Sequence, residues 1–373
     1  WPYSLPRQAI IDPLMNNSQF LSMCTADAIE KSASQLIAGH LVAFPTETVY
    51  GLGADASNPE AVRRIYEVKG RPVDHPLIVH ISSIHLLDMW ATDIPEYAIK
   101  LASEFWPGPM TLILKRQELA RDFVTGSQDS VGIRIPSDPI ALELLTRFES
   151  LGGLGVAAPS ANRFGQVSPT SPSDVVDEIG SYLSPGDLIL NGVHSDVGIE
   201  STIINCRNLA PGILRPGTIT VAMINSVTKV HLTDSPKSEL RVSGGLEKHY
   251  APNATVVINQ VPKPGQAFMA LAHIQTPTDV YRIAAPEGIN EFAKILYGAM
   301  RKADELGFNT FVIQVPDGQG IGFGQRVAVF KAQNRVFREG GVDDFVFGLA
   351  GADVVQGIVT FLGHLIDPAR MAL

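Results

Sequence analysis

Cysteine is nearly absent from this chain of 373 residues, which contains only Cys24 and Cys206. Two cysteines provide neither a disulfide framework nor a zinc-binding pattern, so we expect the protein to work in a reducing compartment such as the cytoplasm. No stretch reads as a signal peptide, because the opening WPYSLPRQAIIDPL has no basic start followed by an apolar run. The sequence does not begin with Met, and we interpret this as a trimmed start.

Long apolar runs and an excess of positive charge are absent as well. The most apolar late window, Phe345–Ile366, contains Asp353, Gln356, His364 and four glycines, which makes it too polar for a bilayer span. Its apolar residues recur at helical spacing and predict an ordinary packing helix. The net charge of −9 argues against broad nucleic-acid binding, because neutralising phosphates requires a basic surface. Any anion site must therefore concentrate cations locally.

What the chain does have is the hydrophobic content of a globular protein, 45% of its residues. Strand-like and helix-like runs alternate over most of its length, which predicts an α/β fold. After about Val230 the composition becomes polar and rich in Gly and Pro, as in a linker. The expected organisation is an N-terminal extension (1–22), a larger α/β domain (23–230), a linker (231–253) and a smaller α/β domain with an unplaced tail (254–373).

Helix ends are marked by local capping residues. The residues at one helix start are Asn58, Pro59 and Glu60, which read as an N-cap, a first-turn proline and a first-turn acid. They open a helix that ends near Val68. The other expected helices are Asp27–Ala38, Ile94–Phe105, Ile140–Phe148, Ser173–Ile179 and Ile289–Leu306. The expected strands are Leu41–Phe44, Leu77–Ile81, Met110–Leu114, Val131–Ile135, Gly155–Ala158, Asp187–Leu190, Ser201–Asn205, Ile213–Arg215, Thr255–Ile258 and Phe311–Val315.

The stretch FPTETVYGLGADASNPEAVRRIYEVKGRPVDHPLIVHI, residues 44–81, combines cations with bent backbone but lacks a nucleophile–base pair and metal-ligand spacing. Lys69 and Arg71 are two residues apart, so in an extended loop both side chains leave the same side of the backbone, which suits a polyphosphate. The alternative is a solvated charge pair, but Gly70 and Pro72 fix the backbone around it. His80 alternates with apolar neighbours on a strand, and either faces a cavity or is a satisfied, partly buried histidine.

Polar and cationic residues also occur at the expected ends of later strands. Arg134 lies inside an apolar strand and must meet an anion there, either a structural carboxylate or a ligand carboxylate. The APSAN motif supplies the Ser160 hydroxyl and the Asn162 amide after a short strand, where α/β sheets bind ligands. GIEST and LRPG add further hydroxyls and a fourth candidate cation, Arg215.

The ordered set of these motifs resembles the Sua5/YrdC/YciO family over roughly residues 25–220. The matching segments are FPTETVYGLG, KGRP, PLIVHI, WPGPMTLIL, VGIRIP, APSAN followed by SPT, GIEST and LRPG. RKADELG and GIGFGQRVAV are similar to the C-terminal domain of the long Sua5 branch. The resemblance implies a YrdC-like twisted mixed sheet with helices and a concave cationic cavity, plus a smaller Rossmann-like domain.

The same resemblance implies synthesis of L-threonylcarbamoyl-AMP from L-threonine, bicarbonate or CO2, and ATP, with release of pyrophosphate. The threonine amine attacks CO2 and the carbamate oxygen attacks the α-phosphate, so the substrates supply both nucleophiles and the protein positions and screens them. Mg²⁺ is expected to bind through the ATP phosphates, since no carboxylate cluster provides a metal cage. The product would pass to a tRNA-modifying transferase.

Residue roles follow from the resemblance as expectations. Lys69 and Arg71 would be the catalytic cations facing the phosphates, and Arg134 would take the threonine carboxylate with its planar fork. Hydroxyl donors would confer specificity for the threonine side chain. The expected ATP-binding residues are Lys69, Arg71, His75, Ser130, Asn162, Thr170, Arg215, His249 and Tyr250, and the expected threonine-binding residues are Thr48, His80, Arg134, Ser160 and Ser201.

The chain departs from the family pattern at two places. His75 stands where the family loop commonly has an ATP-contacting asparagine, and the linker Ser243–Pro252 keeps HYAP, with His249 and Tyr250, but loses a proline and an upstream tyrosine of the usual lid. These departures leave open a paralogue that adenylates the carbamate of another amine. Carbamoyl transfer and a noncatalytic nucleotide- or RNA-binding module are further alternatives.

Overall fold

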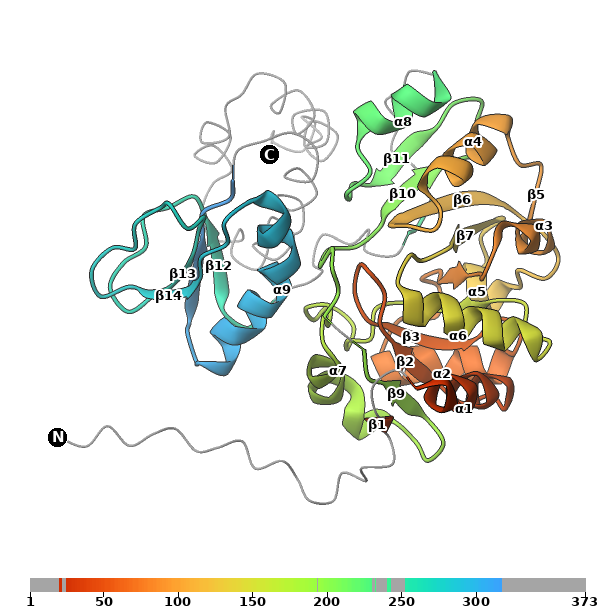
Figure 1. The fold of residues 1–373 in the computed structure, drawn as a ribbon, viewed down its shortest axis with the longest axis horizontal. Helices are drawn as coiled ribbons and strands as arrows, with labels where there is room; N and C mark the ends of the chain where they lie inside the picture. The colour runs from red at the N-terminus through yellow and green to blue at the C-terminus, as the bar shows by residue number, and fades with distance from the viewer. Residues whose placement is uncertain are drawn as a thin grey trace, which may run out of the picture.

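The computed structural model describes residues 20–21, 25–192, 194–229, 232, 240–242 and 252–316 (Figure 1). The helix predicted within Phe345–Ile366 lies outside this part, and so do His249 and Tyr250. Most of the predicted linker and nearly all of the N-terminal extension lie outside it as well. Among the described helices, none has both the length and the hydrophobicity that crossing a bilayer requires.

The larger domain is built on an eleven-stranded sheet that mixes parallel and antiparallel neighbours. The order is β1-β9-β2-β3-β8-β4-β7-β6-β10-β11, with β5 paired to β6. This confirms the predicted mixed-sheet α/β fold. The strands are β1 (Phe20–Leu21), β2 (Val42–Phe44), β3 (Gly51–Asp55), β4 (Ile78–His80), β5 (Ala91–Thr92), β6 (Met110–Arg116), β7 (Ser130–Arg134), β8 (Val156–Ala157), β9 (Leu188–Leu190), β10 (Thr202–Asn205) and β11 (Gly212–Arg215).

Helices pack against this sheet, and α2 begins where its capping residues predict. Asn58 caps α2 by accepting hydrogen bonds from the backbone N–H groups of Glu60 and Ala61, and Gly70 ends the helix in the left-handed conformation at φ 61°. The helices are α1 (Ala26–Ile37), α2 (Pro59–Lys69), α3 (Leu87–Trp90), α4 (Glu96–Phe105), α5 (Asp122–Thr125), α6 (Pro139–Ser150), α7 (Pro172–Ile179) and α8 (Val221–Thr228), with short 3-10 turns at Ile84–Leu86 and Gly180–Tyr182.

Two local predictions in the first motif were wrong. None of the expected strands covers residues 51–55, yet these residues form β3. Packing requires a small residue there, because a Cβ at Gly53 would lie 2.8 Å from both the Phe44 ring and Val156. Lys69 and Arg71 do not lie on extended backbone either. Lys69 is the last residue of α2, and the left-handed turn at Gly70 separates the two.

The smaller domain carries a four-stranded parallel sheet in the order β12-β15-β13-β14, in agreement with the Rossmann-like expectation. Its elements are β12 (Thr255–Ile258), β13 (Ala267–Met269), β14 (Tyr281–Ala284), α9 (Ile289–Glu305) and β15 (Thr310–Ile313). Helix α9 lies on the side of this domain that faces the larger one (Figure 1). Val49 and Val167 of the larger domain belong to the apolar cluster around α9, so the two domains share a core.

Candidate active site

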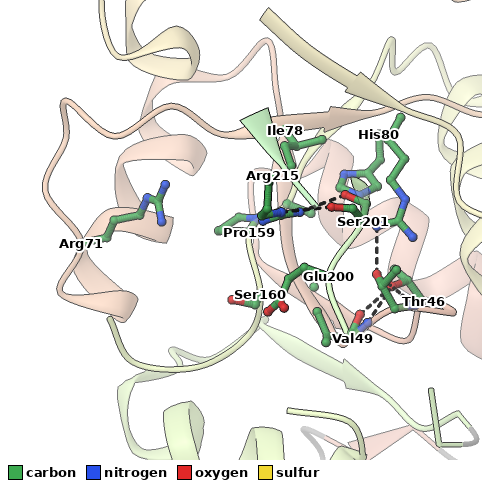
Figure 2. Close-up of a pocket in the computed structure, with 14 residues that line it drawn as sticks. Thr46, Val49, Arg71, Ile78, His80, Pro159, Ser160, Glu200, Ser201 and Arg215 are labelled. Atoms are coloured by element: carbon green, nitrogen blue, oxygen red, sulfur yellow. Dashed lines mark hydrogen bonds between the residues drawn. The ribbon is translucent and has the colours of Figure 1, made fainter. Parts of the chain in front are cut away.

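A cavity with about 520 Å³ of empty space, part of it open to solvent, lies in the larger domain (Figure 2). It lies where β4, β7 and β11 end and where the loops after β2 and β8 and before β10 meet. Its lining residues are Thr46, Thr48, Val49, Gly51, Arg71, Ile78, His80, Arg134, Ala158, Pro159, Ser160, Glu200, Ser201 and Arg215. Segments far apart in sequence therefore converge on one hollow.

Arg134 meets a structural carboxylate, one of the two alternatives that its sequence position left open. Its Nη2 lies 2.7 Å from Oε1 of Glu47, and both side chains are buried. Nη1 donates to Thr48 Oγ1 at 2.9 Å, and Nε donates to the Gly108 carbonyl at 3.3 Å. These contacts hold the guanidinium at the cavity wall and leave it N–H donors toward a second acceptor, since arginine carries five.

Arg215 and Ser201 form a second fixed pair, which Figure 2 shows joined by dashed lines. The guanidinium donates from Nε to the Ser201 carbonyl at 3.0 Å and from Nη2 to the Ser201 hydroxyl at 2.9 Å. The same hydroxyl lies 2.8 Å from Thr111 Oγ1. Ser201 is thus oriented on two sides before any ligand arrives.

His80 lines the cavity as a neutral imidazole. Burial, and then the charge of Arg134, lower the pKa of His80 to about 3. Among the described residues, nothing hydrogen-bonds its Nδ1, although the atom is buried. A buried polar atom of this kind is costly unless something satisfies it, which makes His80 a candidate ligand contact.

Lys69 and Arg71 are both buried, with exposed fractions of 2% and 6%. The alternative interpretation, a pair of solvated surface charges, is therefore wrong. Lys69 does not line the cavity. Its Nζ donates to the carbonyl oxygens of Ser160 and Asn162, directly behind the lining residue Ser160, and burial lowers its pKa well below the usual range. Arg71 does line the cavity, on the opposite side from His80 (Figure 2), and donates to the Pro76 carbonyl at 2.9 Å.

Besides Lys69, four residues expected to bind ATP are absent from the lining of the cavity. The Asn162 side-chain amide donates hydrogen bonds to the carbonyls of Arg163 and Gln166. The backbone N–H and the hydroxyl of Thr170 donate to the Asp174 carboxylate. Ser130 lines a second, smaller cavity. The His75 ring packs edge-on against the Phe164 ring, with 5.4 Å between the ring centroids. The residues that the structure does bring together are Thr48, Arg71, His80, Arg134, Ser160, Ser201 and Arg215.

Two acidic residues were missed by sequence reasoning. Glu47 lies next to Thr48 in the first motif and braces Arg134. Glu200 lies next to Ser201 in GIEST and lines the cavity, where it accepts hydrogen bonds from the hydroxyls of Ser168 and Tyr297. Each lies directly before a hydroxyl residue of its motif, Thr48 or Ser201, that was expected to bind threonine. The signal available in the sequence was therefore an acidic residue adjacent to such a hydroxyl.

Known proteins share this architecture. Residues 34–217 match the Sua5/YciO/YrdC family model, whose description is telomere recombination, and residues 219–328 match a model described as the C-terminal domain of threonylcarbamoyl-AMP synthase. A threonylcarbamoyl-AMP synthase of Pyrococcus abyssi is 36% identical over 306 residues, which are 76% of this chain and 87% of the relative. The chain belongs to the Sua5/YciO/YrdC family.

Other Sua5-type proteins agree with this membership. A threonylcarbamoyl-AMP synthase of Bacillus subtilis is 42% identical over 235 residues, which are 62% of this chain and 66% of the relative. The structure of P. abyssi Sua5 complexed with L-threonine superposes with a TM-score of 0.74 at 32% identity, over 82% of this chain and 94% of that one. Both domains of the Sua5 architecture are thus present here.

Proposed function

We propose that this chain synthesises L-threonylcarbamoyl-AMP from L-threonine, bicarbonate or CO2, and ATP, and releases pyrophosphate. Its membership of the Sua5/YciO/YrdC family and the names of its relatives support this activity. The observation that carries the proposal is the cavity itself: Arg71, Arg134 and Arg215 line one hollow in a chain of net charge −9. A local concentration of cations in an acidic protein suits substrates that carry a carboxylate and phosphates.

Threonine would bind on the Arg134 side of the cavity. Arg134 is held from behind by Glu47 and Thr48, and its remaining donors can take the substrate carboxylate. The neutral imidazole of His80 lacks a partner at Nδ1 among the described residues and can accept from the threonine hydroxyl. With a pKa of about 3, His80 is too weak a base to remove the ammonium proton, so its role is hydrogen bonding.

ATP would place its phosphates on the Arg71 side, with Lys69 behind the Ser160 segment. A polyphosphate there would favour the charged form of Lys69, whose pKa burial otherwise lowers. Mg²⁺ would enter this arrangement bound to the ATP phosphates. The described residues contain no group of three or more His, Cys, Asp or Glu that could hold a metal, so the phosphates would be its ligands. Bound there, the ion would screen phosphate charge.

The protein's contribution to the chemistry would be positioning and charge screening. The threonine amine attacks CO2 to give a carbamate, and a carbamate oxygen then displaces pyrophosphate from the α-phosphate of ATP. Both nucleophiles belong to substrates, so no protein nucleophile is needed. The product would serve the tRNA-modifying transferase that forms threonylcarbamoyladenosine.

The test is pyrophosphate release by the purified chain with ATP, bicarbonate and Mg²⁺, with and without threonine. We expect release that depends on threonine and is much weaker with serine, valine or simple amines. Release with another amine but not with threonine would replace this proposal by a paralogous synthase. Absence of release with every amine would reject synthase activity altogether.

A further inference from the structure

The cavity must also accommodate the amino group of its substrate, and one carboxylate in its lining can accept a hydrogen bond from that group. Glu200 is the single acidic side chain among the described residues that line the cavity. Figure 2 labels Glu200 among the residues that line the cavity. An ionised carboxylate is a charge-assisted acceptor for an amine or ammonium N–H.

Glu200 is held by both domains. Its Oε1 accepts a hydrogen bond from Ser168 Oγ at 2.7 Å, and its Oε2 accepts one from the Tyr297 hydroxyl at 2.5 Å. Ser168 lies in the larger domain, whereas Tyr297 lies on α9 of the smaller domain, and both are fully buried. Each carboxylate oxygen has a second lone-pair direction, so the two hydroxyls fix its orientation without exhausting its capacity to accept.

Helix α9 docks one face against α7 and the loop that precedes β10. Lys294, Tyr297 and Arg301 follow helical spacing and reach Asp196, Glu200 and Glu178, respectively, at 2.7, 2.5 and 2.9 Å. At Gly198, with φ at +71°, a Cβ would lie only 2.5 Å from the Lys294 Cα. The segment that carries Glu200 therefore rests directly on the backbone of α9.

We propose that Glu200 accepts a hydrogen bond from the amino group of threonine, and that Tyr297 of the C-terminal domain is the positioning residue that holds it in place. This inference rests on the proposed function for the identity of the substrate. Arg134 and Glu200 then bind opposite ends of the amino acid, the carboxylate and the amine, and leave the amine oriented for attack on CO2. The smaller domain thereby contributes to the threonine site through the hydrogen bond that Tyr297 of α9 donates to Glu200 of the larger domain.

The test compares Glu200→Gln, Tyr297→Phe, the double variant and Lys294→Ala in the full chain. Lys294→Ala is the matched control, because it removes an exposed ion pair from the same face of α9 without reaching the cavity. Each variant is assayed for KM of threonine, KM of ATP and kcat, and threonine binding is measured separately by calorimetry, which needs no turnover.

Glu200→Gln is expected to raise the KM and the dissociation constant for threonine about tenfold with little change in the KM for ATP. Tyr297→Phe should raise them about threefold, and the double variant should be no worse than Glu200→Gln, because Tyr297 acts through Glu200. Lys294→Ala should match the wild type. Circular dichroism melts confirm that each variant is folded.

An unchanged threonine affinity in Glu200→Gln would overturn the inference. So would additive effects of the two substitutions on threonine affinity in the double variant, or a loss of threonine affinity in Lys294→Ala equal to that in Glu200→Gln. Failure of the proposed function gives a different pattern, since the wild type itself would then show neither threonine-dependent pyrophosphate release nor threonine binding.

Discussion

Lowering the pH should destabilise the larger domain through His80. The folded protein holds its imidazole neutral, with a pKa of about 3, whereas the unfolded chain has the ordinary value of 6.5. Below pH 6.5 the unfolded state therefore binds a proton at His80 that the folded state does not bind. The free energy of unfolding falls as the pH falls from 6.5 toward 3. Between about pH 8 and about pH 5 the loss from this one group is about 2 kcal/mol.

The assay is urea unfolding at those two pH values, followed by tryptophan fluorescence. Trp90 and Trp106 are buried in the larger domain and report on the same unit as His80. His80→Gln removes the titrating group, so its stability should fall by about 2 kcal/mol less than that of the wild type over this interval. His273→Gln, at an exposed histidine of the smaller domain, controls for the loss of a histidine as such.

The reasoning would be refuted by equal pH dependence in the wild type and His80→Gln. That result would mean that the folded protein accepts a proton on His80 as readily as the unfolded chain does. Its proposed role as a neutral acceptor for the threonine hydroxyl would then fall as well.

Three further predictions concern the cations of the site. Arg71→Ala should lower kcat/KM about a hundredfold or more while leaving the melting temperature nearly unchanged, and unaltered kinetics would remove Arg71 from the site. Arg134→Lys should raise the KM for threonine about tenfold but not that for ATP, because lysine lacks the planar fork; equal effects on both substrates would contradict a carboxylate role. ATP binding should take up protons in alkaline buffer, where the lowered pKa leaves part of Lys69 neutral until phosphates raise it. Calorimetry in two buffers of different ionisation enthalpy measures the uptake, and Lys69→Met should reduce it.

Local chemistry made much of the fold predictable. Thr255–Ile258 was predicted with the bounds that β12 has, and α2 begins after Asn58 as its capping residues indicate. These features depend on residues within a few positions of each other, and such signals are complete in the sequence.

Features that depend on distant partners were not predictable in the same way. Strand β3 contains glycines that local propensity disfavours, and only the closeness of Phe44 and Val156 explains them. The contact between Glu200 and Tyr297 spans 97 residues and two domains, and the pairing of Arg134 with Glu47 joins the end of one strand to the loop after another. A sequence names the residues of such pairs without saying which of them meet.

The most direct test of the proposed synthesis is the incorporation of labelled bicarbonate into an AMP-linked product by the purified chain. The account predicts that label appears in L-threonylcarbamoyl-AMP when ATP and threonine are both present, in amounts that match pyrophosphate release. Label in an adenylate that forms without threonine, or no labelled adenylate alongside pyrophosphate release, would contradict it.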